Sequence, residues 1–162
     1  MLAQGERAHI VNTASVAGLL SPPAMGVYNA SKHAVVSLTE TLYHDLKNVT
    51  DAVSCSLLCP AFVPTGIANA ERSRPDDLRN EAPLTRSQQA ADLQLQRAVR
   101  SGKLTPDDVA KATFEAVREG RFYILTHPQI LASVKLRHED IETLRNPTDP
   151  LSLKPEVKKA PQ

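Results

Sequence analysis

An apolar strand, a long helix and a second apolar strand follow one another early in the chain, and this order constrains the fold most strongly. Residues 8–13 read as a short buried strand, residues 27–47 as an amphipathic helix, and residues 51–58 as a strand rich in Val, Ser, Cys and Leu. Because a full helix separates the two strands, we expect them to pair in parallel. The sequence therefore predicts an α/β fold with a parallel sheet.

The predicted helix carries apolar residues at four-residue intervals, and these should pack against the sheet. They are Ala30, Ala34, Leu38, Leu42 and Leu46, with Val35 beside them. The other face of the helix then contains Val36 and Tyr43.

Three side chains with complementary chemistry lie around the start of this helix. Ser15 comes just beyond the first strand, and Lys32 follows Tyr28 by four residues, so the last two side chains project from one helix face. A fixed ammonium favours the phenolate form of a neighbouring tyrosine. A serine hydroxyl can donate a hydrogen bond to a carbonyl oxygen as charge develops, while the tyrosine gives or takes the proton. Hydride transfer to or from a carbonyl would use all three side chains.

The whole string is more specific than the spacing, since Tyr-x-x-x-Lys also occurs as an ordinary surface pair. The strand ends in Asn-Thr-Ala-Ser, a loop of small residues follows, and the helix opens with Tyr-Asn-Ala-Ser-Lys-His-Ala-Val. This string closely resembles the active-site segment of the short-chain dehydrogenase/reductase family. The resemblance implies that Ser15, Tyr28 and Lys32 are the catalytic residues. It also implies a partial Rossmann-like, doubly wound parallel sheet, the carboxyl-terminal half of such a domain.

A second segment, Cys-Pro-Ala-Phe-Val-Pro-Thr-Gly-Ile, follows the second strand. It resembles the family's Pro-Gly-x-Val-x-Thr segment beside the nicotinamide ring, although Ala61 stands where glycine is usual and would disfavour a positive φ. The resemblance implies NAD or NADP as the cofactor, with Lys32 hydrogen-bonded to the nicotinamide ribose. The implied cofactor-binding residues are Tyr28, Lys32, Pro60, Val63 and Thr65.

The chain contains neither Gly-x-x-x-Gly-x-Gly nor Gly-x-Gly-x-x-Gly, and its six glycines do not cluster. A Rossmann fold uses such a turn, at a helix N-terminus, to cradle the pyrophosphate of a dinucleotide. The family also uses an asparagine on a preceding helix, a role that Asn12 and Asn29 do not fill. The resemblance covers residues 8–128. We therefore expect a carboxyl-terminal fragment with weak or no affinity for NADH or NADPH, and the residue that selects NAD or NADP lies outside it.

Residues 69–102 are polar and charged, and they read as a loop followed by an amphipathic helix at residues 86–100. In the family, this region covers the substrate. A mobile lid is one hypothesis for it, motivated by its low apolar content, and a merely solvated face is the alternative.

The remaining chain predicts a helix, a strand and a helix. Residues 105–108, Thr-Pro-Asp-Asp, are typical of a helix start. This helix should run to Glu119, and a short strand at residues 121–126 and a last helix at about residues 129–144 should follow. The side chains expected to be buried on the first of these helices are Val109, Ala110, Phe114 and Val117.

The length and charge of the chain bound its organisation. Its 162 residues are one domain's worth of chain, predicted at residues 1–145, and the prolines and charges of residues 146–162 indicate a disordered tail. Nineteen basic and eighteen acidic residues leave a net charge of +1, which gives little support to nucleic acid or an anionic membrane as a partner. No membrane span or signal-peptide pattern occurs, so we expect a cytoplasmic protein.

The two cysteines, Cys55 and Cys59, lie four residues apart on one strand. Their spacing along a strand is too long for an easy disulfide, so we predict buried free thiols. The histidines show no ligand spacing beside the cysteines, and no metal site is expected.

The leading hypothesis is an NAD(P)-dependent oxidoreductase that interconverts an alcohol and a ketone or aldehyde. The resemblance also implies a homo-oligomer formed through the helix at residues 28–47, with Val36 and Tyr43 meeting a second subunit. A non-catalytic oligomerising or binding remnant is the alternative. An epimerase relative that uses the same tyrosine and lysine is a third reading, less favoured by the context of Ser15 and by residues 60–65.

Overall fold

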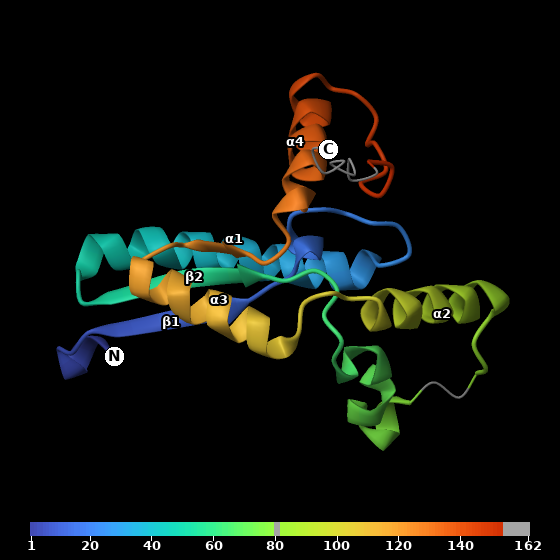
Figure 1. The fold of residues 1–162 in the computed structure, drawn as a ribbon, viewed down its shortest axis with the longest axis horizontal. Coiled ribbons are helices and arrows are strands. Elements are labelled where there is room, and N and C mark those ends of the chain that lie inside the picture. The colour runs from blue at the N-terminus through green and yellow to red at the C-terminus, as the bar shows by residue number, and fades with distance from the viewer. Residues whose placement is uncertain (80–81, 154–162) are drawn as a thin grey trace, which may run out of the picture.

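The computed structural model describes residues 1–79 and 82–153, and it contains a parallel sheet with helices on both faces (Figure 1). The strands are β1 (Ala8–Thr13), β2 (Val53–Cys59) and β3 (Tyr123–Leu125), in the order β1-β2-β3. The register pairs Ala8 with Val53 and Leu57 with Tyr123. The predicted α/β class, the parallel pairing and the partial Rossmann-like architecture are confirmed.

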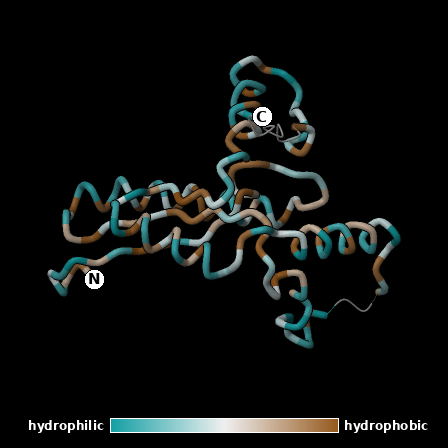
Figure 2. Tube along the Cα trace, viewed as in Figure 1, coloured by the Kyte–Doolittle hydropathy of each residue, from teal (hydrophilic) through white to brown (hydrophobic). Residues whose placement is uncertain are grey.

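The main helices cover opposite faces of this sheet. Helix α1 (Gly26–Val49) packs on one face, where Val36 and Leu46 contact alternate residues of β2. Helix α3 (Pro106–Glu119) packs on the other face, where Ala116 is fully buried against Leu58 and Ile124. Successive strand residues point to opposite faces, so β2 contributes to both halves of the core. Figure 2 shows the hydrophobic stretches concentrated along the strands and the helices that flank them.

The predicted inner and outer faces of α1 are wrong in part: Leu46 is buried, and Val35 and Leu42 pack against the core as expected, but other positions differ. Val36 is buried in the core and the ring of Tyr43 packs edge-to-face on Phe122, whereas Ala30, Ala34 and Leu38 are exposed. An α-helix turns once in about 3.6 residues, so positions spaced by four rotate by roughly 40° at each step and drift around the helix. The buried positions instead follow the helical period, and they are Asn29, Val36, Thr39 and Leu46.

The predicted face of α3 is wrong in part. Phe114 is 72% exposed and Ala110 is exposed, whereas Ala116 is fully buried and Val109 packs beside it. The inward stripe also contains Thr113, whose hydroxyl donates to the Val109 carbonyl oxygen at 2.8 Å. A threonine that satisfies its own hydroxyl in this way can occupy a partly buried position, which the apolar pattern did not reveal.

The predicted boundaries of α3 are confirmed, because both ends have specific stop signals. Thr105 and Asp108 form a capping box at its start, which satisfies two backbone donors. Gly120 ends the helix with φ of +67°, a conformation that glycine adopts without the steric cost a side chain would bring.

Two further units extend from the sheet. The 3₁₀ segments Gly66–Ser73 and Asp76–Leu78 and helix α2 (Arg86–Arg100) lie together at one end, and the predicted helix at residues 86–100 is confirmed. Helix α4 (Leu131–Glu142) follows the short 3₁₀ turn Pro128–Ile130 after β3. None of the helices in the described ranges is long and apolar enough to cross a membrane.

The chain after α4 folds back on that helix as far as it is described. The Asp140 carboxylate accepts the backbone N–H of Thr148 at 2.8 Å and lies 3.1 Å from the Arg145 guanidinium. Ser133 donates to the Pro150 carbonyl oxygen at 2.8 Å. The tail predicted at residues 146–162 is therefore described to residue 153, and residues 154–162 lie outside the described residues.

Candidate active site

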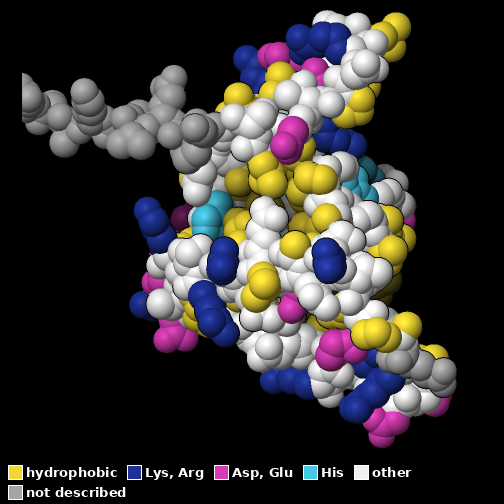
Figure 3. Space-filling model, turned by 90° about the vertical axis from the view of Figure 1, so that its right-hand side faces the viewer, with side chains coloured by type: hydrophobic (Ala, Val, Ile, Leu, Met, Phe, Trp, Pro, Cys, Tyr) yellow, Lys and Arg dark blue, Asp and Glu magenta, His cyan; other side chains and the backbone are white. Residues whose placement is uncertain are grey.

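The carboxyl ends of the strands meet at one edge of the sheet, and the predicted site residues lie in the segments that leave this edge. Thr13, Cys59 and Leu125 end the strands there. Figure 3 looks onto this side of the molecule, where hydrophobic side chains gather between the α4 region above and the α2 region below. In open parallel sheets, ligands bind outside this edge.

Ser15 sits in the turn directly after β1 and is 8% exposed. Its Oγ accepts the backbone N–H of Ala17 at 3.2 Å and donates to the carbonyl oxygen of Pro60 over 3.4 Å. The second bond is long and therefore weak, so the hydroxyl can give it up for a better acceptor. The turn itself is fixed more firmly, because Val16 N–H donates to the same Pro60 oxygen at 2.9 Å.

Gly18 lets the Ser15 turn approach α1 closely. A Cβ on Gly18 would lie 2.7 Å from the Lys32 carbonyl oxygen and 2.8 Å from Cγ2 of Val36. Both distances are far below normal van der Waals contact, so a side chain would push the turn away from the helix. Gly18 thus sets the distance between Ser15 and the helix that carries Tyr28 and Lys32.

Tyr28 and Lys32 lie on successive turns at the start of α1, as the spacing predicted. The Lys32 ammonium donates to the Thr13 carbonyl oxygen at 3.2 Å and lies 5.7 Å from the centroid of the Tyr28 ring. The hydrogen bond ties the lysine to the end of β1, and the distance to the ring is within cation–π range. The strand end therefore holds a positive charge beside the tyrosine.

The loop before α1 is shaped by two local features. Ala24 has φ of +62°, and Asn29 donates from Nδ2 to the Pro22 carbonyl oxygen at 2.9 Å. Asn29 is 7% exposed, so this bond is shielded from water. It attaches the loop to the first turn of the helix. The position of Tyr28, which lies in that turn, is thereby fixed relative to the loop.

The segment 60–65, which the sequence predicts to bind the cofactor and which we call the cofactor segment, starts beside Ser15 and then leads away from it. Pro60 contacts the Ser15 turn, Val63 is half-buried, and Thr65 caps the next 3₁₀ segment by accepting the backbone N–H of Ile67 at 3.3 Å. Among the described residues, no hydrogen bond joins Val63 or Thr65 to Ser15, Tyr28 or Lys32. Ala61 does not have a positive φ, so it replaces the usual glycine without strain.

Cys59 lies beneath the Ser15 turn and is fully buried. Burial raises the pKa of its thiol to about 11, an effect that the Ser15 backbone N–H and the positive charge of Lys32 partly offset. Cys55 is also buried and its pKa is raised by burial. Both cysteines are free, which confirms the predicted thiols, and burial favours their protonated form over the nucleophilic thiolate.

Sequence reasoning missed Gly18, Asn29 and His127 as parts of this edge. His127 follows β3 directly, and its Nδ1 accepts the backbone N–H of Ala61 at 3.4 Å. Its position immediately after a strand was the available signal, because adjacent parallel strands end at the same edge.

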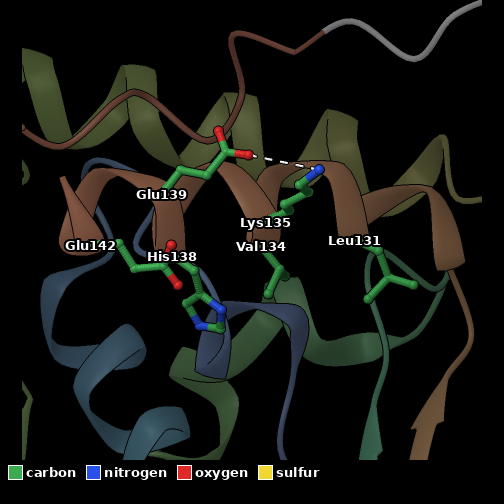
Figure 4. Close-up of a pocket in the computed structure, with 6 residues that line it drawn as sticks. All are labelled: Leu131, Val134, Lys135, His138, Glu139 and Glu142. Atoms are coloured by element: carbon green, nitrogen blue, oxygen red, sulfur yellow. Dashed lines mark ion pairs between the residues drawn. The ribbon is translucent and has the colours of Figure 1, made fainter.

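The surface hollows found in the described part of the chain do not form a competing site. One runs along α4 and is lined by Leu131, Val134, Lys135, His138, Glu139 and Glu142 (Figure 4). All of these residues belong to a single helix, and Lys135 and Glu139 lie 3.8 Å apart as an ion pair. Within the described ranges, no cluster of His, Cys, Asp and Glu side chains has the arrangement of a metal site.

Comparisons with known proteins agree with this geometry. The family model described as short chain dehydrogenase matches residues 1–76. A CLA biosynthesis dehydrogenase/reductase of Lactiplantibacillus plantarum is 34% identical over 150 residues, which are 88% of this chain and 51% of that protein. A 3beta-hydroxysteroid dehydrogenase of Mediterraneibacter gnavus is 42% identical over 67 residues, 41% of this chain and 23% of that protein.

A solved structure is much more similar. The crystal structure of a short chain dehydrogenase/reductase from Burkholderia phymatum in complex with NAD is 79% identical, with a TM-score of 0.91 over 94% of this chain and 54% of that one. The fold and the edge residues define a Rossmann-type α/β protein. The chain belongs to the short-chain dehydrogenase/reductase family. The chain spans about half the length of two of these relatives, namely 51% of the Lactiplantibacillus plantarum protein and 54% of the Burkholderia phymatum structure.

Proposed function

We propose that the protein is an NAD(P)-dependent oxidoreductase that interconverts an alcohol and a ketone or aldehyde. The observation that carries this proposal is the hydrogen bond from Lys32 Nζ to the Thr13 carbonyl oxygen, at 3.2 Å, which holds the ammonium 5.7 Å from the Tyr28 ring centroid. The bound NAD of the Burkholderia phymatum relative supports a nicotinamide cofactor. The choice between NAD and NADP stays open.

The residues of the edge fit such a cofactor. A lysine ammonium has three N–H donors, and the Thr13 carbonyl oxygen uses one of them. The others are available to the hydroxyls of the nicotinamide ribose, while Pro60, Val63 and Thr65 would flank the nicotinamide ring. The cofactor, when bound, supplies or accepts the hydride.

The proton moves through the protein's own side chains. In the reducing direction, Tyr28 donates its hydroxyl proton to the substrate oxygen, and in the oxidising direction it takes the proton back. Lys32 favours the phenolate that Tyr28 becomes when it has given up the proton. Ser15 exchanges its long bond to Pro60, 3.4 Å, for a hydrogen bond to the substrate oxygen, which stabilises negative charge there.

Two further parts of the proposal concern neighbouring surfaces. Residues 69–102 would cover a small-molecule substrate, and the projecting position of α2 supports this assignment. The helix at residues 28–47 would form a homo-oligomer interface. Its solvent side supports this, since Leu38 is 69% exposed and Ala30 and Ala34 are exposed beside it.

A second candidate is a non-catalytic binding or oligomerising protein that keeps the motif. The absence of a glycine-rich turn from the sequence favours it, because dinucleotide binding in this fold depends on such a turn. The change in absorbance at 340 nm with cofactor and substrate separates the two candidates.

The test is an assay of the native gene product with NADH, NADPH and a panel of ketones and aldehydes. Tyr28→Phe is expected to lower kcat by roughly 10²- to 10⁴-fold, the usual contribution of a general acid or base, while cofactor affinity changes little. Tyr43→Phe is the matched control, because Tyr43 lies on the same helix but packs on Phe122. Near-normal turnover in Tyr28→Phe would refute the assigned role. No turnover by the wild type with any substrate would favour the second candidate.

A further inference from the structure

The peptide group that leaves β2, between Pro60 and Ala61, is held at both of its polar atoms by different parts of the chain. Its Pro60 carbonyl oxygen accepts Val16 N–H at 2.9 Å, and its Ala61 N–H donates to Nδ1 of His127 over a longer distance, 3.4 Å. The first contact comes from the turn after β1 and the second from the end of β3. The start of the cofactor segment is thus bonded to both neighbouring strands.

Phe62, the residue after Ala61, is restrained by the close packing of its backbone against Gly102. A Cβ on Gly102 would lie 2.5 Å from the Phe62 carbonyl oxygen and 2.9 Å from Cδ of Pro64. Gly102 follows α2, so the chain that leaves the carboxyl end of that helix lies directly on the cofactor segment. Because the Pro60 carbonyl and the Ala61 N–H share one planar peptide group, the bond to His127 adds to the bond from Val16 in fixing the orientation of this group.

Nδ1 of His127 can accept the Ala61 N–H in one protonation state of the ring only. A backbone N–H can only donate, so Nδ1 must carry a lone pair, and a neutral ring then holds its proton on Nε2. The Thr126 hydroxyl also lies 2.8 Å from Nδ1, and it can donate to the same atom. A protonated ring would carry hydrogen on both nitrogens, so it would lose the bond from Ala61, while Nδ1–H could donate to the Thr126 hydroxyl oxygen.

The surroundings of the ring keep it neutral near pH 7. The groups that contact Nδ1 are Ala61 from the segment after β2 and Thr126 from the end of β3, and both are uncharged. Burial lowers the pKa of His127, and no charged side chain of the described α3, α4 or strand residues contributes to the change. A neutral ring with its proton on Nε2 therefore supplies the acceptor under ordinary conditions.

We propose that His127 is a positioning residue, whose Nδ1 holds the Ala61 N–H and so fixes the cofactor segment for binding of the nicotinamide ring. The proposal rests on the proposed function only for the identity of the ligand. His127 acts through the backbone of residues 60–65 and does not take part in proton transfer. Its protonation releases the segment, so cofactor binding weakens at acid pH.

The direct test is hydrogen exchange of the Ala61 amide, resolved by NMR and corrected for the intrinsic rate at each pH. His127→Ala is expected to lower the protection of this amide by roughly 2- to 3-fold, the low end of the effect of one hydrogen bond, because the 3.4 Å bond is long. His127→Asn can present Oδ1 as an acceptor at the same place and should restore protection. The amide of Val16, bonded to Pro60 at 2.9 Å, is the internal control.

Acidification gives a second readout that needs no variant. In the wild type, Ala61 protection should fall below the ordinary histidine pKa of about 6.5 and stay constant above it, whereas in His127→Asn it should not depend on pH. Equal Ala61 protection in the wild type and His127→Ala would overturn the proposal. If His127→Ala unfolds, Val16 loses protection as well, and the pH comparison between the wild type and His127→Asn then decides.

Kinetics connect the contact to the reaction. His127→Ala should raise KM for the nicotinamide cofactor with a smaller change in kcat, and His127→Asn should be close to the wild type. An unchanged KM together with lost Ala61 protection would contradict positioning and leave a structural contact. Because amide exchange is measured without cofactor, failure of the proposed oxidoreductase activity would not alter the result for His127.

Discussion

Gly18→Ala should separate the Ser15 turn from α1 and thereby damage both stability and catalysis. The new Cβ would lie 2.7 Å from the Lys32 carbonyl oxygen, whereas ordinary contact begins at 3.4 Å. The turn or the helix must therefore move by about 0.7 Å, the difference between these distances. Overpacking of this kind costs about 1–3 kcal/mol. For a chain of this length, the expected fall in Tm is roughly 2–10 °C.

The same movement displaces Ser15 relative to Tyr28 and Lys32. A misplacement of about 1 Å can cost roughly 100-fold in rate, so we expect kcat to fall by about tenfold or more. The assays are thermal unfolding followed by circular dichroism and steady-state turnover at 340 nm.

Gly26→Ala is the matched control, because nothing lies within 4 Å of a Cβ at that position. It exchanges glycine for alanine at the first residue of α1 and should leave Tm and kcat unchanged or slightly raise Tm. If Gly18→Ala and Gly26→Ala had the same Tm and the same kcat, the close approach at Gly18 would not position the site.

Three further predictions concern single side chains. Ala24→Gly should raise the free energy of unfolding by about 0.5–1 kcal/mol. Ala24 has φ of +62°, and the steric cost of that conformation for alanine exceeds the entropy that glycine gains in the unfolded chain. A lower urea midpoint in the variant would contradict this. Burial raises the pKa of Cys59 to about 11, so its thiol should not react with a thiol reagent at pH 8 until the protein is unfolded in guanidinium. Fast reaction of the native protein would show that solvent reaches Cys59. Burial and the hydrogen bond to Glu40 raise the pKa of Tyr123 to about 12. The folded state therefore keeps a proton that the unfolded state releases near pH 10. The stability difference between the wild type and Tyr123→Phe should be present below pH 10 and decline between pH 10 and pH 12, whereas parallel stability curves would refute the shift.

Elements with strong local signals could be predicted from the sequence. The strand at residues 8–13 and the helix at residues 86–100 match β1 and α2 at both ends. The start of α3 at Thr105 and its end at Gly120 also match, because capping chemistry is local. The positions of Ser15, Tyr28 and Lys32 at the strand edge followed from the motif.

The faces of the helices could not be predicted as reliably. Spacing by four residues suggested that Leu38 was buried and Val36 exposed, and the structure has the reverse. Which arc of α1 meets the sheet depends on tertiary packing, and polar residues such as Thr39, fully buried and bonded to Asn12 at 3.1 Å, occupy part of that arc. An apolar pattern has no means of detecting such pairs.

The supporting contacts of the site depend on the tertiary structure in the same way. Gly18 and Gly102 matter because of backbone atoms distant in sequence, and His127 is 66 residues from the amide it accepts. No local pattern distinguishes these residues from ordinary loop residues. Only the position of His127 directly after a strand, at the edge where the parallel strands end, indicated that it lies near the site.

The most direct test of the central claim is deuterium transfer from reduced nicotinamide cofactor labelled at C4. The native gene product is incubated with the labelled cofactor and a ketone or aldehyde, and the alcohol product is analysed by mass spectrometry. The account predicts that the deuterium appears on the carbinol carbon, and that Tyr28→Phe slows its appearance by roughly 10²- to 10⁴-fold. Alcohol product without deuterium, or equal rates in the wild type and Tyr28→Phe, would contradict it.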